Sequence, residues 1–288
     1  MRLRFGLYAF PFELGGVVAD AVRAEECGFD VLATGDHIRH PRDPGVALLD
    51  GWSVLANWAA HTQKVRLAML VSNLIYRDPV LLAKQAVAVD QLSNGRLDLG
   101  IGTGVYATDH LMAGVPEWSP GEKVGRLGEA LEIVDGLLRG AITEYEGRYY
   151  RFEQASVSPG PVQNPRPPLT VGAESPRTLR LAARYADRWM SFGGFASTPG
   201  EYEASVENRI RILDKHCEEI GRDPDSITRS LFVFRPLDPW RSRGDFESIV
   251  ERFSAMGFAE FIFPSPSSDQ LVVFDRVVTE VIPQYQRG

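Results

Sequence analysis

Apolar residues recur along this chain with two periods, which together predict an alternation of β-strands and helices. Some predicted strands, such as VRLAMLV at 65–71, are apolar at nearly every position. This pattern is typical of strands that are buried on both faces of a parallel sheet. The predicted strands are Leu3–Tyr8, Asp30–Thr34, Arg66–Val71, Leu97–Ile101, Leu169–Gly172, Arg188–Ser191, Ile227–Phe234 and Glu260–Phe263.

A helical pattern follows every predicted strand. At Leu127, Leu131 and Val134, for example, the apolar spacing is that of an amphipathic helix. Eight strand–helix pairs predict an α/β fold of the TIM (β/α)8 barrel type, and an open doubly wound sheet is the alternative. The predicted helices begin near Gly16, Asp50, Pro79, Gly121, Pro176, Gly200, Gly244 and Asp269.

Two longer segments interrupt the alternation, one after the second strand (38–49) and one after the fourth (144–168). The second insertion begins with EYEGRYYRFE and ends with the Pro-rich PGPVQNPRPP. It predicts a short strand or hairpin and an extended connector, packed over the barrel where they would help to shape a pocket. The chain of 288 residues suits a single domain, 1–288, because such barrels often run to ~250 residues.

Composition argues against two classes of protein, nucleic-acid-binding proteins and membrane-spanning proteins. A net charge of −7 argues against nucleic-acid binding, and no apolar run approaches the ~18 residues of a membrane span. The N-terminus lacks the features of a signal peptide. Cys27 and Cys217 are read as buried apolar residues in a reducing compartment. We therefore expect a cytoplasmic protein, and the apolar helices after strands two to four favour a homodimer.

The segment KQAVAVDQLSNGRLDLGIGTG at 84–104 is the most informative part of the chain. Its helix ends at Asn94-Gly95, and the strand that follows ends in Gly102-Thr103-Gly104. Sites in α/β barrels lie at the carboxyl ends of the strands, where glycines let the backbone approach a ligand closely.

The same rule selects Asp36 and His37, which follow the second strand, as the best acid/base pair. Histidine titrates near neutral pH, and an adjacent carboxylate can raise its pKa or orient its neighbours. A surface loop histidine is the alternative. A metal site at Asp36, His37 and His40 matches no standard zinc spacing, so no metal is expected.

The stretch Gly172-Ala173-Glu174-Ser175-Pro176-Arg177-Thr178 follows the fifth strand and predicts a capped helix start. Free N–H groups and the positive end of the helix dipole make such a start an anion site, with Ser175, Arg177 and Thr178 as helpers. Simple helix capping is the alternative. The chain has no GxGxxG after its first strand, no P-loop and no GxSxG, so classical NAD binding is not expected.

Taken together, these motifs resemble the luciferase-like flavin and deazaflavin oxidoreductases, a superfamily of TIM barrels. The resemblance lies in four segments spread along almost the whole chain: GFDVLATGDHI (28–38), VRLAMLVSNLIYRDPVLLAKQAVAVDQLSNGRLDLGIGTG (65–104), PRPPLTVGAESPRTLRLAARYADRW (165–189) and MGFAEFIF (256–263).

The resemblance implies a cofactor at the carboxyl end of the barrel, with its phosphate near Ser175 and Thr178. It also implies a non-prolyl cis peptide around Leu70, Val71 and Ser72, whose bulge supports the cofactor ring. By the same resemblance His37 would transfer a proton. The positions that contact the cofactor in F420-dependent members are held here by Asp36, Asn73, Thr103, Gly104 and Thr108.

GIGTG at 100–104 looks closer to F420-dependent members than to luciferase proper, which has an arginine in place of Thr103. The leading hypothesis is hydride transfer between F420 and a small organic substrate. One alternative is a two-component monooxygenase that uses O₂ and reduced FMN from a separate reductase; another is a non-catalytic binder of such a cofactor. Val105 stands where the sugar-phosphate dehydrogenases have a glutamate, which leaves Asp109 or Glu13 as a second acid/base.

Overall fold

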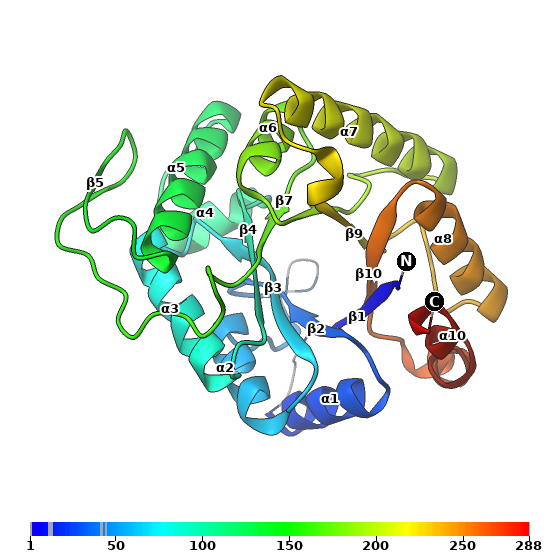
Figure 1. Ribbon diagram of the computed structural model, residues 1–288. Coiled ribbons are helices and arrows are strands. Elements are labelled where there is room, and N and C mark those ends of the chain that lie inside the picture. Colours follow the sequence, from blue (N-terminus) through cyan, green and yellow to red (C-terminus); the bar gives the residue numbers. More distant parts are fainter. Residues whose placement is uncertain (1, 11–13, 41–42, 44, 288) are drawn as a thin grey trace.

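A computed structural model describes residues 2–10, 14–40, 43 and 45–287. Eight parallel strands close into a barrel in the order β1-β10-β9-β8-β7-β4-β3-β2 (Figure 1). The predicted TIM barrel is thus confirmed, and the open-sheet alternative is wrong. The barrel strands are β1 (Arg4–Tyr8), β2 (Val31–Thr34), β3 (Arg66–Asn73), β4 (Leu97–Gly102), β7 (Leu169–Gly172), β8 (Arg188–Ser191), β9 (Thr228–Phe232) and β10 (Phe258–Pro264).

Helices surround the barrel, and several begin where a cap residue is followed by proline. Asp78, Ser119, Ser175 and Thr198 each accept a backbone N–H of the first turn, and the next residue is Pro in every case. The helices are α1 (Leu14–Glu26), α2 (Gly51–His61), α3 (Pro79–Leu92), α4 (Ala107–Ala113), α5 (Pro120–Leu138), α6 (Pro176–Tyr185), α7 (Pro199–Glu219), α8 (Arg243–Ala255), α9 (Leu271–Arg276) and α10 (Ile282–Gln286), with single turns at Pro224–Ser226, Ser268–Gln270 and Val277–Val281.

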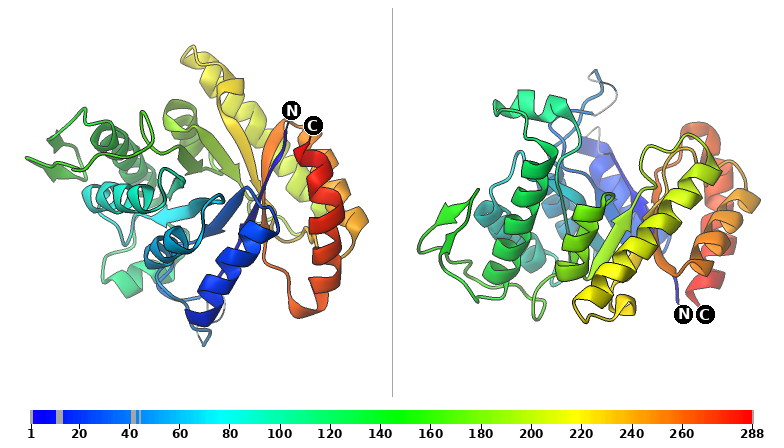
Figure 2. Two further views of the ribbon diagram at one scale, coloured as in Figure 1. Left: turned by 60° about the horizontal axis from the view of Figure 1, so that its bottom comes forward. Right: turned by 90° about the horizontal axis from the view of Figure 1, so that it is seen from above.

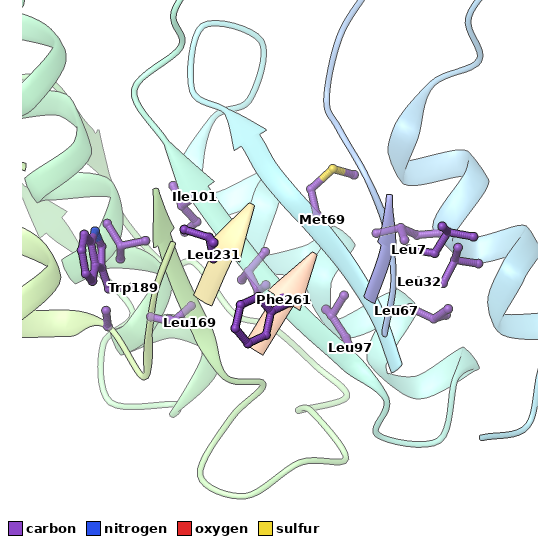
Figure 3. Close-up of a cluster of buried hydrophobic side chains, with 14 of the residues drawn as sticks. Leu7, Leu32, Leu67, Met69, Leu97, Ile101, Leu169, Trp189, Leu231 and Phe261 are labelled. Carbon is purple, nitrogen blue, oxygen red and sulfur yellow. The ribbon is translucent and has the colours of Figure 1, made fainter. Parts of the chain in front are cut away.

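The strands alternate between an outer and an inner face. Outward-facing side chains pack beneath the helices and form the main hydrophobic core (Figure 3). A smaller apolar cluster fills the inside of the barrel near its carboxyl end. Burial on both faces explains why the strands read as continuous apolar runs. The core residues labelled in Figure 3 include Leu7, Leu32, Leu67, Met69, Leu97, Ile101, Leu169, Trp189, Leu231 and Phe261.

The amino-terminal end of the barrel interior is filled by charge rather than by apolar side chains. Asp98 lies 2.6 Å from Arg66, 3.1 Å from Arg188 and 3.3 Å from Arg4. Glu260 lies 3.0 Å from Arg4 and 3.7 Å from Arg188. We call Arg4, Arg66, Asp98, Arg188 and Glu260 the floor network.

The insertion is a hairpin, β5 (Tyr145–Glu146) with β6 (Arg151–Phe152), and the two strands are antiparallel. The expectation that it packs over the barrel is wrong. The hairpin lies outside α5, at the periphery of the molecule (Figure 1). The Tyr149 amide donates to Glu129 of α5 over 2.9 Å, and Lys84 of α3 donates to the Ser158 carbonyl over 2.6 Å. The insertion therefore covers outer helices rather than the barrel mouth.

The two ends of the described chain lie side by side, with β1 next to β10 (Figure 2). Strand boundaries differ from the predicted ones by a few residues. The difference that bears on the site is that β3 continues to Asn73, which brings two further predicted site residues, Ser72 and Asn73, into the barrel wall. The short helix α4 was not predicted, and it carries Thr108 and Asp109. Among the described residues, no helix is both long and apolar enough to span a membrane.

Candidate active site

Asp36 is held firmly at the carboxyl end of β2. It is 3% exposed, and both of its carboxylate oxygens are engaged. Oδ2 accepts the Asn73 amide over 3.0 Å and Arg77 Nε over 3.1 Å, while Oδ1 accepts Arg77 Nη2 over 2.9 Å. Arg77 also donates to Asp50 over 2.6 Å. Asp36 therefore joins the end of β2 to the end of β3, and both of its oxygens are used within the protein.

His37 differs from its neighbour because it is only partly buried. Among the described residues, neither of its ring nitrogens has a hydrogen-bond partner. Burial lowers the pKa of His37 below its ordinary value, and the carboxylates of Asp109 and Asp36 offset this only in part. His37 is therefore neutral at pH 7, with a ring nitrogen free to accept a proton.

Tyr8, at the end of β1, approaches the same point of the site. A methyl group built on Gly35 would lie 2.2 Å from the Tyr8 hydroxyl and 3.2 Å from His37 Nε2. Only glycine fits between them, so Gly35 permits the phenol and the imidazole to converge. Burial is the main cause that raises the pKa of Tyr8, followed by Tyr106 and Asp36. Tyr8 therefore stays protonated across the physiological range.

Asn73 connects this cluster to α4. Its Nδ2 donates to Asp109 over 2.8 Å, and its Oδ1 accepts the Ile75 amide over 3.1 Å. Gly104 has a φ of +76°, and a methyl group there would lie 2.6 Å from Asn73 Oδ1. The predicted residues Asp36, His37, Asn73 and Gly104 are thus brought together, and Asp109 joins them. We call Asp36, His37, Asn73, Arg77 and Asp109 the rim cluster.

The expected cis peptide is present, at Leu70–Val71, and the β3–β4 register shifts at this bulge. Gly102 of β4 makes room for the Val71 side chain, whereas Gly172 of β7 lies at ordinary contact distance from it. A methyl group on Gly102 would lie 2.4 Å from Val71 Cγ2, and one on Gly172 would lie 3.4 Å from Val71 Cγ1. Gly102 thus accommodates Val71, and close approach of a ligand to the glycines at this edge stays a prediction. Leu70 and Val71 belong to the apolar cluster inside the barrel, and we call their surface the Val71 shelf.

The start of α6 is a capping box. Ser175 Oγ accepts the Thr178 amide over 3.3 Å, and Thr178 Oγ1 accepts the Ser175 amide over 3.0 Å. Helix capping thus uses both hydroxyls. Arg177 is exposed and has no ion-pair partner among the described residues, so a cation remains at this helix start. The feature is compatible with both alternatives, capping and anion binding.

Four other predicted residues follow β4 and β7. Glu174 points toward the next strand and helix: it accepts the Phe192 amide over 2.9 Å and pairs with Arg209 over 2.8 Å. The Ala173 carbonyl accepts Trp189 Nε1 over 2.9 Å. Thr108 is exposed on α4, and Thr103 is half-buried at the end of β4. Glu174 and Ala173 thus already have partners within the protein.

The sequence analysis missed Tyr8 and Arg77. Tyr8 is the last residue of a strand, and an inward orientation follows from the strand period counted back from Arg4. Arg77 had no sequence signal, because its role depends on Asp36 and Asp50, which come from other segments.

His40 Nδ1 accepts the Asp43 amide over 2.9 Å. No group of three metal-ligating side chains occurs within the described part of the chain. Glu13, the other candidate acid/base, lies outside the described residues.

Comparisons with known proteins agree on one family. A family model described as luciferase-like monooxygenase matches residues 4–239. An uncharacterised protein of Mycobacterium tuberculosis is 30% identical over 288 residues, covering 88% of this chain and 98% of that protein. An F420-dependent glucose-6-phosphate dehydrogenase of Microbacterium testaceum is 30% identical over 236 residues, covering 80% of this chain and 67% of that protein.

Among solved structures, an F420-dependent secondary alcohol dehydrogenase in complex with an F420-acetone adduct is similar to this chain. The TM-score is 0.83 at 19% identity, and the match covers 100% of both chains. At this identity the likeness establishes a shared fold.

Proposed function

Because the chain belongs to the luciferase-like monooxygenase family, we propose that it is an oxidoreductase that transfers a hydride between coenzyme F420 and a small organic substrate. One observation carries the proposal: the Val71 shelf and His37, whose ring nitrogens have no hydrogen-bond partner within the described part of the chain, stand at the same end of the barrel, where barrel enzymes hold their substrates. An apolar shelf suits a planar ring, and a neutral imidazole suits proton transfer.

The residues present fit such a cofactor. Val71 is partly exposed above Gly102 and Gly172, and it offers an apolar surface against which a ring can rest. The free Arg177 at the α6 start, with Ser175 and Thr178 beside it, suits a phosphate. We propose that Thr103, Gly104 and Thr108 contact the remainder of the cofactor. When bound, F420 supplies or accepts the hydride.

The protein's own part is to hold the proton that accompanies the hydride. A neutral His37 is ready to accept a proton from a substrate hydroxyl at Nε2 when the substrate is oxidised. The charge that then develops on the ring is favoured by Asp109 and Asp36. Asp36 acts as a positioning residue, because Arg77 and the Asn73 amide fix it in place.

Titration of the purified protein with F420 and, separately, with FMN tests the cofactor, with cofactor fluorescence as the signal. Tight binding of F420 alone supports the proposal. Tight binding of FMN alone contradicts it. An Arg177→Gln variant should weaken F420 binding about tenfold, because it removes a charge at the helix start.

The description of the family favours one second candidate, a monooxygenase that uses O₂ and reduced FMN supplied by a separate reductase. Consumption of O₂ in step with loss of substrate would distinguish it from hydride transfer to F420. A third candidate, a binder without catalytic activity, gains support only if His37 is dispensable and a broad screen finds no turnover.

We also propose that the protein acts in the cytoplasm as a homodimer. Leu81 and Leu92 of α3 are 51% and 61% exposed, and they are apolar groups that a second copy could cover. Light scattering on the purified protein would measure the mass. A monomer that persists at high protein concentration would contradict the dimer.

A further inference from the structure

A cavity of about 740 Å³ lies beside the barrel mouth, between the loops that follow β8, β9 and β10. Its size is that of a small-molecule site. Most of its lining is apolar or aromatic, and Arg235 and Asp238 are the charged residues in it. The lining residues that matter here are Phe234, Arg235, Leu237, Asp238 and Ser265.

A row of aromatic rings runs from this cavity into the barrel mouth. Phe234 stacks on Phe232 with ring centroids 5.7 Å apart, Phe232 lies 4.9 Å from Tyr8, and Tyr8 lies 4.9 Å from Phe10. Phe10, Phe232 and Phe234 are all partly exposed. The Ser265 hydroxyl, which lines the cavity, donates to the Tyr8 carbonyl over 3.1 Å. The cavity and the mouth therefore adjoin.

The two charged groups of the cavity are not equivalent. Asp238 is engaged: Gln270 Nε2 donates to both of its oxygens over 3.1 Å, and the Trp240 amide donates to Oδ1 over 3.1 Å. Arg235 is exposed and has no hydrogen-bond or ion-pair partner among the described residues. Within the part of the chain that the structure describes, Arg235 is thus a cation without a partner at the end of an apolar row.

We propose that this cavity binds the carboxylate of an apolar monocarboxylic acid, with Arg235 as the ion-pair partner and with the hydrocarbon or aromatic body lying along Phe234, Phe232 and Tyr8. The acid would be the substrate of the oxidoreductase proposed above. Its role as a substrate rests on that proposed function, whereas its binding in the cavity does not. A phosphate ester is disfavoured, because a single guanidinium is present and the Ser265 and Ser267 hydroxyls already donate, to the Tyr8 carbonyl and to Asp269.

Calorimetric titration of the protein without any cofactor tests the binding step. The probes are aryl- and alkyl-carboxylates of roughly six to twelve carbon atoms, a size that suits the cavity. Each is compared with its matching primary alcohol and with inorganic phosphate. The acids should bind more tightly than the alcohols. Arg235→Gln should weaken binding of the acids by about tenfold and leave the alcohols unchanged, whereas Arg235→Lys should restore part of the affinity.

Arg241→Gln is the matched control. Arg241 lies in the same loop, is exposed and pairs with Asp245, but it does not line the cavity. Equal losses in the Arg235→Gln and Arg241→Gln variants would overturn the proposal. So would alcohols that bind as tightly as acids, phosphate that binds better than either, or no binding by any acid. Failure to bind F420 would leave these results intact, so the two proposals fail separately.

Discussion

Charged side chains gather at both ends of the barrel, in the floor network and in the rim cluster, yet the two groups are organised in opposite ways. In the floor network each acidic group lies within 4 Å of two or three arginines. Burial opposes ionisation of Asp98, but Arg188, Arg66 and Arg4 outweigh it and hold its pKa below the usual range. In the rim cluster both oxygens of Asp36 are engaged by Arg77 and the Asn73 amide, but the ring nitrogens of His37 have no hydrogen-bond partner among the described residues.

This difference distinguishes charged groups that stabilise the fold from groups that are available for a reaction. A charged group whose partners all come from the protein serves to join strands. Removing one member of such a network leaves its partners buried and without an opposite charge, which is costly. A titratable group that is partly buried, faces an open mouth and has no partner is available to a substrate. By this criterion we propose that the floor network is structural, that Asp36 is a positioning residue and that His37 is the reactive group.

The largest expected effect is at the rim. His37→Ala should reduce turnover by about 10²–10⁴-fold, because it removes the proton acceptor, and it should leave the Kd for the cofactor nearly unchanged. Steady-state kinetics and a binding titration measure the two quantities. His61→Ala, a change on the exposed end of α2, is the control. A loss of cofactor affinity with normal turnover at saturation would refute the role given to His37.

A substitution in the floor network should reduce the stability of the protein rather than its turnover. Asp98→Ala leaves three arginines around an empty position and should reduce the free energy of unfolding by about 3–5 kcal/mol, as measured by denaturant titration. Asp214→Ala removes a similar carboxylate from Arg229 at a site that is 29% exposed, and it should cost about 1 kcal/mol or less. Equal losses in the two variants would mean that burial of the floor network carries no special penalty.

Between the two ends, Gly102→Ala tests the Val71 shelf. The added methyl group would lie 2.4 Å from Val71 Cγ2, and overpacking of this kind costs about 1–3 kcal/mol. A second change, Val71→Ala, should recover most of this loss. Gly200→Ala, where nothing lies within 4 Å, should be neutral in the same denaturation experiment. Without recovery in the double variant, the contact with Val71 is not the cause.

The smallest effect is a pH dependence of stability. Because the pKa of folded His37 lies below its ordinary value of 6.5, the unfolded chain takes up the proton first as the pH falls. The contribution of His37 is therefore complete above about pH 6.5 and decreases as the pH falls from there toward the folded pKa. His37→Gln should lose less stability than the wild type over this window. Parallel curves would contradict the assigned direction.

The sequence located Asp36, His37 and Asn73 correctly at strand ends, because the barrel places every such end on one rim. It could not reveal that Asp36 is taken up by Arg77, which is 41 residues away, or that Tyr8 meets His37 across Gly35. It also assigned the wrong place to the insertion, since composition predicts a hairpin but not the surface against which it packs. Whether a polar side chain is free depends on contacts between distant segments.

By itself the sequence determined the eight strand–helix pairs, because hydrophobic period, helix caps and glycine or proline stops act over a few neighbouring residues. It also determined the family, through motifs that recur in order along the chain. Only the tertiary structure decided which charges neutralise each other at the floor, that Gly102 of β4 lies against Val71, and that Arg235 lines a cavity at the end of an aromatic row. These features arise when closure of the barrel brings together residues far apart in the chain, such as Arg4 and Glu260, which are 256 positions apart, and no local pattern encodes such distances.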